Sequence, residues 1–290
     1  MYINCHSYYS LRYGTIPVEE LVTEAKLKGH EYLALTDINN TTGTFDFVKT
    51  CREEGIKPIA GVEFRKGDRL LYIGLAKNLA GYRELNELLT RKNLGEMPMP
   101  DQSPFFQNVF VIYPPTNVPE ILQPHEYVGV RPIDLKRHKN PLLQRREKLV
   151  CLLPVTMRDK KEYELHHLLR SIDHNILLSY LKPEQKATEN EIMMPREVVQ
   201  KWYENYPEII RNTNRLADQC EFEFSFDTPK NKRTFTGSRY EDKVLLESLA
   251  LEGFKDRYHP DDQVAKQRLF DELETIDKLQ FACYFLTTWD

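Results

Sequence analysis

The sequence lacks the features that identify secreted, disulfide-bonded and membrane-spanning proteins. Its five cysteines are odd in number and widely spaced, and no two form a Cys-x-x-Cys pair. This usage argues against a disulfide framework or a cysteine zinc site and suits a reducing compartment. No apolar run is long enough to span a bilayer, and the N-terminus opens into a strand-like segment instead of a signal peptide. We therefore expect a cytoplasmic protein.

A basic excess is also missing. The chain of 290 residues has 40 Lys and Arg against 44 Asp and Glu, which gives a net charge of -4. A protein that binds nucleic acid by its own electrostatics carries a basic excess, so the charge balance disfavours that class. It leaves open a part of a larger nucleic-acid enzyme whose basic groove lies elsewhere. The hydrophobic content of 41% is enough for one large α/β domain or two structural units.

Short apolar runs alternate with amphipathic segments in the first quarter of the chain. Strands are expected at residues 1–5, 32–36, 57–64 and 70–76, with helices between the first three. Strand, helix and strand repeated in this order implies parallel strands joined by right-handed crossovers. In such sheets and barrels the chemistry collects at the carboxyl ends of the strands.

Three polar side chains stand at or near the ends of successive strands: His6, Asp37 and Glu63. One imidazole and two carboxylates form a mixed nitrogen and oxygen ligand set that suits zinc, manganese or iron. The alternative is structural, because any α/β protein places some polar residues at strand ends. The spacing alone leaves both interpretations open.

Several motifs, in this order along the chain, resemble a known family. They are Cys5-His6-Ser7, Ala34-Leu35-Thr36-Asp37, residues 55–64, Leu75-Ala76-Lys77-Asn78, residues 206–220 and residues 272–290. They are similar to the polymerase and histidinol phosphatase (PHP) domain, in the version found at the N-terminus of bacterial DNA polymerase III alpha subunits. The resemblance implies an α/β fold, namely a distorted seven-stranded β/α barrel followed by helices that begin the polymerase palm. It also implies that intact members hold up to three metal ions, which some such polymerases use for 3′–5′ proofreading.

The sequence departs from the metal-binding pattern that the resemblance implies. Ligand positions of the family are filled here by Asn4, Tyr13, Ile38, Leu71, Pro114-Pro115 and Pro154-Val155-Thr156. Three ligand-type residues are retained, His6, Asp37 and Glu63, and three side chains cannot organise a multinuclear centre. We therefore predict a vestigial metal site, with no catalytic residue and no nuclease activity in this segment. No cofactor is expected, although one weakly bound zinc or manganese ion stays open.

The alternative function is a residual metal-dependent 3′–5′ exonuclease or phosphoesterase that combines the three retained residues with further ligands. Two other histidines, His166 and His167, lie on a helix expected over residues 160–172. The apolar face of that helix consists of Leu165, Leu168, Leu169 and Ile172. We interpret the two histidines as packing or surface residues.

The expected organisation is a PHP-like domain over residues 1–226, a linker over 227–239 and the start of the palm region over 240–290. The alternation of Phe222, Phe224 and Phe226 predicts a short strand before the linker.

On this resemblance the parent protein is a DNA-directed DNA polymerase, and its magnesium-binding aspartates are expected beyond Asp290. This segment alone is then inactive. The implied partners are the remainder of the polymerase chain, other replisome subunits, and DNA through the parent enzyme. An alternative parent is the error-prone paralogue used in damage tolerance.

Overall fold

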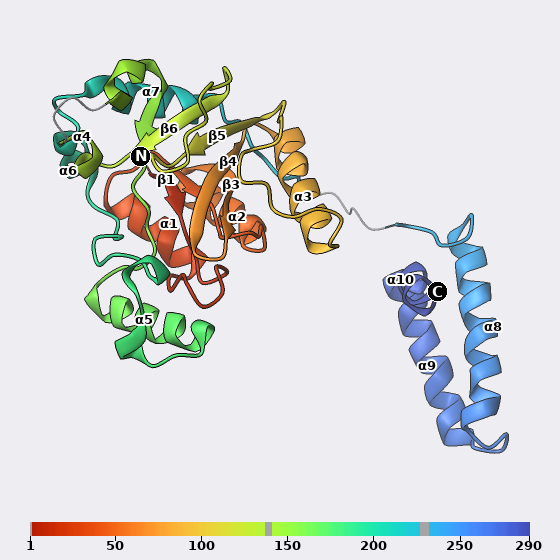
Figure 1. Ribbon diagram of the computed structural model, residues 1–290. Coiled ribbons are helices and arrows are strands. Elements are labelled where there is room, and N and C mark those ends of the chain that lie inside the picture. The colour runs from red at the N-terminus through yellow and green to blue at the C-terminus, as the bar shows by residue number, and fades with distance from the viewer. Residues whose placement is uncertain (1, 137–140, 227–231) are drawn as a thin grey trace. The chain divides into compact units, whose positions relative to one another are not determined.

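A computed structural model describes residues 2–136, 141–226 and 232–290 (Figure 1). The chain divides into two compact units, Met1–Phe224 and Ser225–Asp290. The first contains a β-sheet with covering helices, and the second is helical. The expected linker over 227–239 falls partly on residues 227–231, which lie outside the described residues.

A seven-stranded sheet forms the centre of the first unit, with the strands in sequence order from β1 to β7. The strands are β1 (Tyr2–Cys5), β2 (Tyr32–Leu35), β3 (Lys57–Lys66), β4 (Arg69–Ala76), β5 (Val109–Tyr113), β6 (Glu126–Val130) and β7 (Leu149–Cys151). β1, β2 and β3 pair in parallel, and so do β5, β6 and β7.

The parallel pairing expected for strands joined by helices does not extend to β4, which is antiparallel to both of its neighbours. Only Gly67 and Asp68 separate β3 from β4, and so short a connection can join antiparallel strands but not parallel ones. Gly67 has a φ of +60°, which lies in the left-handed region that glycine adopts without strain.

The sheet curls until the chain beyond β7 meets β1 again. The His6 N–H donates to the Val155 carbonyl at 2.8 Å, and the Val155 N–H donates to the Asn4 carbonyl at 3.0 Å. Pro154 has no N–H to donate, and pairing beyond β7 is a single bridge at Val155. The predicted α/β class and barrel-like sheet are confirmed.

Helices surround this sheet, with α5 set apart from it at the lower left (Figure 1). They are α1 (Val18–Leu27), α2 (Thr44–Glu54), α3 (Leu79–Asn93), α4 (Pro132–Leu135), α5 (Lys160–His174), α6 (Arg196–Trp202) and α7 (Pro207–Asp218), with short 3-10 helices η1 (Pro141–Lys148), η2 (Leu178–Tyr180) and η3 (Pro183–Gln185). α1 and α2 bury one-sided apolar faces, as their periodicity predicts. α3 packs through Leu85, Leu88 and Leu89 and encloses a second core.

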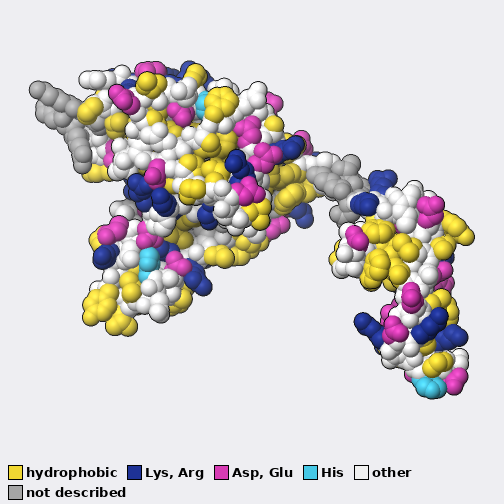
Figure 2. Space-filling view, turned by 45° about the vertical axis from the view of Figure 1, so that its right-hand side comes forward, with side chains coloured by type: hydrophobic (Ala, Val, Ile, Leu, Met, Phe, Trp, Pro, Cys, Tyr) yellow, Lys and Arg dark blue, Asp and Glu magenta, His cyan; other side chains and the backbone are white. Residues whose placement is uncertain are grey.

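α5 is buried on its polar side. Its buried residues are Glu162, His166, Arg170 and Ser171. The apolar side chains assigned from the sequence to its packing face point outward, and Leu165, Leu168 and Ile172 are 45%, 47% and 55% exposed. Hydrophobic side chains are visible on the surface of this lobe, at the lower left of Figure 2. The helix therefore shows the reverse of ordinary amphipathic packing.

The strand expected over Phe222–Phe226 is not formed, because residues 221–226 follow an irregular path. Phe222 and Phe224 are buried, and both rings pack edge-on against Tyr82 of α3. Their alternation reflects packing onto helices and not pairing within a sheet.

The second unit contains three helices, α8 (Arg239–Arg257), α9 (Gln263–Leu279) and α10 (Ala282–Trp289). The Ser238 hydroxyl caps α8 by accepting from the Glu241 N–H at 3.2 Å, and Asp262 caps α9 by accepting from the Ala265 N–H at 2.9 Å. Within the described residues of both units, no helix has the length and apolar character that crossing a membrane requires.

Candidate functional site at the barrel mouth

The three retained ligand-type residues lie together at the mouth of the curled sheet. His6 follows β1, Asp37 follows β2, and Glu63 lies within β3, and each of the three is at most 1% exposed. His6 Nε2 lies 3.0 Å from Glu63 Oε2. Asp37 contacts the residue after His6, because the Ser7 N–H donates to Asp37 Oδ1 at 2.7 Å. The parallel register of β1, β2 and β3 brings these chain segments side by side.

Glu63 has three side-chain donors. The Asn4 amide Nδ2 donates to Oε2 at 2.9 Å, His6 Nε2 lies on the same oxygen, and the Arg65 guanidinium donates to Oε1. Burial alone would raise the pKa of the Glu63 carboxyl, but the charge of Arg65 and these hydrogen bonds hold it well below its ordinary value. Glu63 is therefore an ionised carboxylate inside the protein.

Arg65 supplies the buried cation of the site. Its side chain is only 11% exposed, and its guanidinium carbon lies 4.2 Å from the centre of the Tyr13 ring. Its Nη2 donates to the Tyr13 hydroxyl at 3.1 Å. Burial lowers the pKa of Arg65, but the charge of Glu63 more than offsets this and leaves it above its ordinary value.

Sequence reasoning did not single out Arg65. A signal was present, because Arg65 stands two residues after Glu63 on one strand, and alternate residues of a strand share a face.

Both ring nitrogens of His6 face acceptors. Nε2 faces the Glu63 carboxylate, and Nδ1 lies 3.0 Å from the Thr156 hydroxyl oxygen. That hydroxyl also donates to Glu191 Oε2 at 2.8 Å. An imidazole ligates a metal through a nitrogen lone pair, and here each ring nitrogen is already engaged with a protein group.

Asp37 is enclosed by the loop after β1. The Ser7 hydroxyl donates to Oδ2 at 2.7 Å, and the Ser10 hydroxyl donates to Oδ1 at 2.6 Å. Burial raises the pKa of Asp37 above its ordinary value, against the lowering effect of these hydrogen bonds. The Ser10 oxygen also accepts from the Ile38 N–H at 3.0 Å, so Asp37 organises two loops at the mouth.

The substituted ligand positions also have structural partners. The Asn4 amide oxygen, which is the only atom of that side chain able to ligate a metal, accepts from the Thr36 hydroxyl at 2.8 Å. Tyr13 and Ile38 line a pocket of about 420 Å³ beside Arg65. Leu71 is buried in the second core under α3. Pro114-Pro115 follows β5, and Thr156 lies against His6.

The donors present do not fit a multinuclear metal centre. Across residues 2–136, 141–226 and 232–290, no three or more His, Cys, Asp and Glu side chains are arranged to hold a metal ion. His6, Asp37 and Glu63 are neighbours, but each is bonded to protein groups. A divalent ion on Glu63 would also be repelled by the Arg65 guanidinium.

The polar side of α5 closes over this mouth and explains its reversed burial. His166 Nδ1 donates to the Tyr13 carbonyl at 2.7 Å, and Nε2 accepts from the Ala187 N–H at 2.8 Å. Burial lowers the pKa of His166 to about 4, so the ring is neutral at pH 7. Arg170 donates to the Gln185 carbonyl at 2.7 Å. The interpretation of His166 as a packing residue agrees with these contacts.

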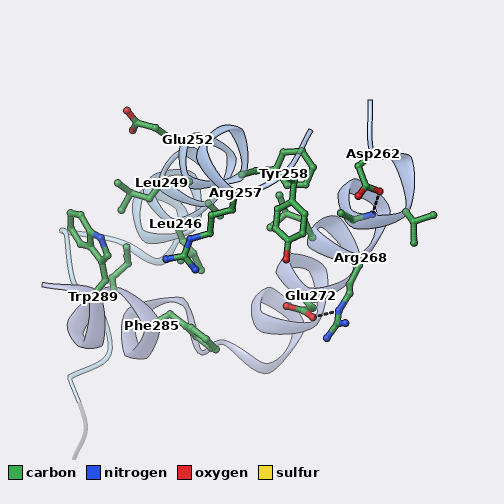
Figure 3. Close-up of a pocket in the computed structure, with 17 residues that line it drawn as sticks. Leu246, Leu249, Glu252, Arg257, Tyr258, Asp262, Arg268, Glu272, Phe285 and Trp289 are labelled. Carbon is green, nitrogen blue, oxygen red and sulfur yellow. Dashed lines mark hydrogen bonds and ion pairs between the residues drawn. The ribbon is translucent and has the colours of Figure 1, made fainter. Parts of the chain in front are cut away.

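In the second unit, a pocket of about 970 Å³ lies among α8, α9 and α10 (Figure 3). Its labelled apolar lining residues are Leu246, Leu249, Phe285 and Trp289. Among its charged lining residues, Arg268 pairs with Glu272 at 2.9 Å and Asp262 caps α9. This pocket has the character of a packing surface and not of a reactive centre.

Comparison with known proteins identifies sequences that are similar to this chain. Residues 3–116 match the family model of the PHP domain. Over its full length the chain is 26% identical to the DNA polymerase III subunit alpha of Halalkalibacterium halodurans, of which it covers 29%, and 26% identical to that of Bacillus subtilis strain 168, also covering 29%. An error-prone DNA polymerase of Symbiobacterium thermophilum is 24% identical over the whole chain, which covers 31% of it.

Residues 3–116 are a PHP domain, as the motifs predicted. The chain as a whole is homologous to the N-terminal portion of DNA polymerase III alpha subunits. It spans about three tenths of the length of these curated relatives. An amidohydrolase structure from Chromobacterium violaceum is 24% identical over 32% of this chain and 34% of its own, with a TM-score of 0.25 that is too low to add to the argument.

Proposed function

We propose that this chain is the N-terminal region of a cytoplasmic DNA polymerase of the III alpha type, and that its PHP domain is a structural module without nuclease activity. The homology along the full chain supports the first part. The observation that carries the second part is the bonding of Glu63 to Asn4, His6 and Arg65. In this proposal the guanidinium of Arg65 takes the place of a metal cation.

The energetics of burial support this interpretation. An ionised carboxylate inside a protein is costly unless a partner charge and hydrogen bonds compensate it. Arg65 provides both to Glu63, so the mouth is stable without an added ion. A metal would have to displace Arg65 from Glu63, separate His6 from Glu63 or Thr156, and detach Asp37 from Ser7 and Ser10. Each change breaks a buried hydrogen bond.

We also propose the parent activity, partners and cofactor that the resemblance implies. The parent is a DNA-directed DNA polymerase whose magnesium ions are bound beyond Asp290. Its partners are the remainder of the polymerase chain, other replisome subunits, and DNA. Replicative and error-prone relatives align with similar identity, 26% and 24%, so either type of parent fits.

One observation favours a second candidate, a residual metal-dependent phosphoesterase. His6, Asp37 and Glu63 lie together, and a pocket of about 420 Å³ opens at the same mouth. A single ion held by these residues would have room for a phosphate group beside it. The two candidates differ in metal content and in DNA cleavage.

The test is metal analysis of the chain purified without chelators, combined with hydrolysis of single-stranded DNA in manganese and in zinc. We expect metal far below one ion per chain, and no cleavage above that of the Asp37→Asn variant, which keeps the size of the side chain. Tightly bound stoichiometric metal, with cleavage that Asp37→Asn abolishes, would establish the phosphoesterase instead.

A further inference from the structure

The outer face of α5 is a continuous apolar ridge. Leu165, Leu168, Leu169 and Ile172 follow the spacing that places residues on one side of a helix. The ridge continues beyond the helix into η2 and its approach, where Leu177, Leu178 and Tyr180 are 68%, 53% and 70% exposed. Single exposed apolar residues are ordinary, but a contiguous apolar surface rimmed by charge marks an interaction site.

The orientation of α5 is fixed by its inner face. Glu162 accepts from the Thr15 hydroxyl at 2.9 Å, and His166 bonds the backbone of Tyr13. Arg170 pairs with Asp68 at 2.5 Å. Rolling the helix to hide its leucines would break these buried hydrogen bonds and ion pairs. These contacts therefore hold the ridge on the outer side of α5.

Lysines outnumber glutamates among the charged side chains of this segment that have no ion-pair partner. Between residues 160 and 186 of the described chain, two glutamates and four lysines have no ion-pair partner, namely Glu164, Glu184, Lys160, Lys161, Lys182 and Lys186. Lys160 and Lys161 lie in the first turn of α5, where a positive charge opposes the helix dipole. The positions of Lys160 and Lys161 become favourable when a negatively charged group of another molecule lies beside them.

We propose that this surface, formed by the apolar residues of α5 and η2, docks an amphipathic α-helix of a partner protein with apolar residues along one side and acidic residues on its flanks. The partner helix runs antiparallel to α5, because its negative carboxyl end then meets Lys160 and Lys161. Leucine ridges at this spacing pack into the grooves of a facing helix.

A second copy of the chain is the less favourable occupant. Two copies of the same basic flank would face each other and repel, whereas an acidic flank complements it. A lipid surface is also disfavoured, because the ridge has no tryptophan. Both remain as measurable outcomes.

The test uses the full chain and three labelled synthetic 18-residue helical peptides in fluorescence anisotropy. All carry the same backbone pattern: one has a leucine ridge with glutamate flanks, one the same ridge with lysine flanks, and one glutamine in place of leucine. We expect the glutamate-flanked peptide to bind at least tenfold more tightly than the other two. Leu168→Glu should abolish this binding, and Lys160→Glu with Lys161→Glu should weaken it at least threefold.

The matched control is Leu27→Glu, which alters another exposed leucine, 79% exposed at the end of α1. It should leave binding unchanged, and circular dichroism melting of both leucine variants should match the parent chain. Equal binding of all three peptides, no binding of any, or binding that survives Leu168→Glu would overturn the proposal. So would a dimer, or binding to phosphatidylglycerol vesicles, that Leu168→Glu removes.

Discussion

The barrel mouth and the outer face of α5 contrast in what they bury and what they expose. At the mouth, the charged groups of Glu63 and Arg65 are buried and bonded to each other. On the outer face of α5, leucines that a helix ordinarily buries are exposed. The charged groups of the mouth are thus paired within this chain, whereas the apolar groups of the α5 ridge are left exposed by it.

The largest effect is expected from removing the ion pair between Glu63 and Arg65 at the mouth. Arg65→Met keeps packing against Tyr13 but leaves Glu63 buried without a countercharge, so we expect a loss of about 3–5 kcal/mol in the free energy of unfolding. The double variant with Glu63→Gln removes the stranded charge and should recover at least half of the loss. Urea unfolding followed by circular dichroism measures both.

The matched control for Arg65 is Arg69→Met, which breaks the exposed pair with Asp101. Its expected cost is within about 1 kcal/mol, because exposed ion pairs contribute little. A loss at Arg65→Met no larger than that of the control would show that Arg65 does not stabilise the mouth.

The second prediction concerns pH and the attachment of α5 to the mouth. The unfolded chain protonates His166 below its ordinary pKa of 6.5, whereas the folded chain protonates it only below a pKa of about 4. The stability from neutral His166 is therefore present above pH 6.5 and lost as the pH falls towards 4, by up to about 3 kcal/mol. Glu63, whose pKa is also lowered, adds a further loss in more acidic solution.

Urea unfolding at a series of pH values measures the slope of the free energy of unfolding against pH. His166→Gln should reduce the slope between pH 6.5 and 4 and lower the stability at pH 7, while His30, whose pKa burial also lowers to about 4, keeps the remaining slope. His259→Gln, which changes a histidine with a side chain 78% exposed, should keep the slope of the parent chain. If the pH dependence of the free energy of unfolding is the same in His166→Gln as in the parent chain, His166 is not a source of that dependence.

The smallest effect is expected at the α5 ridge. Leu168→Glu should change the free energy of unfolding by no more than about 0.5 kcal/mol, because its side chain is exposed in the free chain. Leu21→Ala, in the buried face of α1, should cost about 2–5 kcal/mol. A large loss at Leu168→Glu would mean that the ridge is buried within the chain itself, and thermal melting of the two variants decides this.

Much of the fold follows from the sequence because short-range rules decide it. The apolar runs and their connections predict β1, β2 and β3, and parallel pairing predicts that His6, Asp37 and Glu63 meet. The direction of β4 depends on a two-residue turn, which the sequence also contains. These features follow from local chemistry.

The features that the sequence did not predict depend on tertiary partners. The periodicity of α5 gives its apolar side correctly, but the rule that apolar sides face inward is overridden by the polar contacts of Glu162, His166 and Arg170. Arg65 shares one face of β3 with Glu63, but the sequence alone does not show that both side chains are buried there. Phe222 and Phe224 alternate like strand residues but pack on helices.

The most direct test of the central claim, that Arg65 takes the place of a metal cation, is anomalous diffraction from crystals of this chain grown with manganese. The account predicts the Arg65 guanidinium on Glu63 and no ordered manganese ion beside His6. Two or three ordered ions clustered against His6, Asp37 and Glu63, with Arg65 displaced, would contradict it.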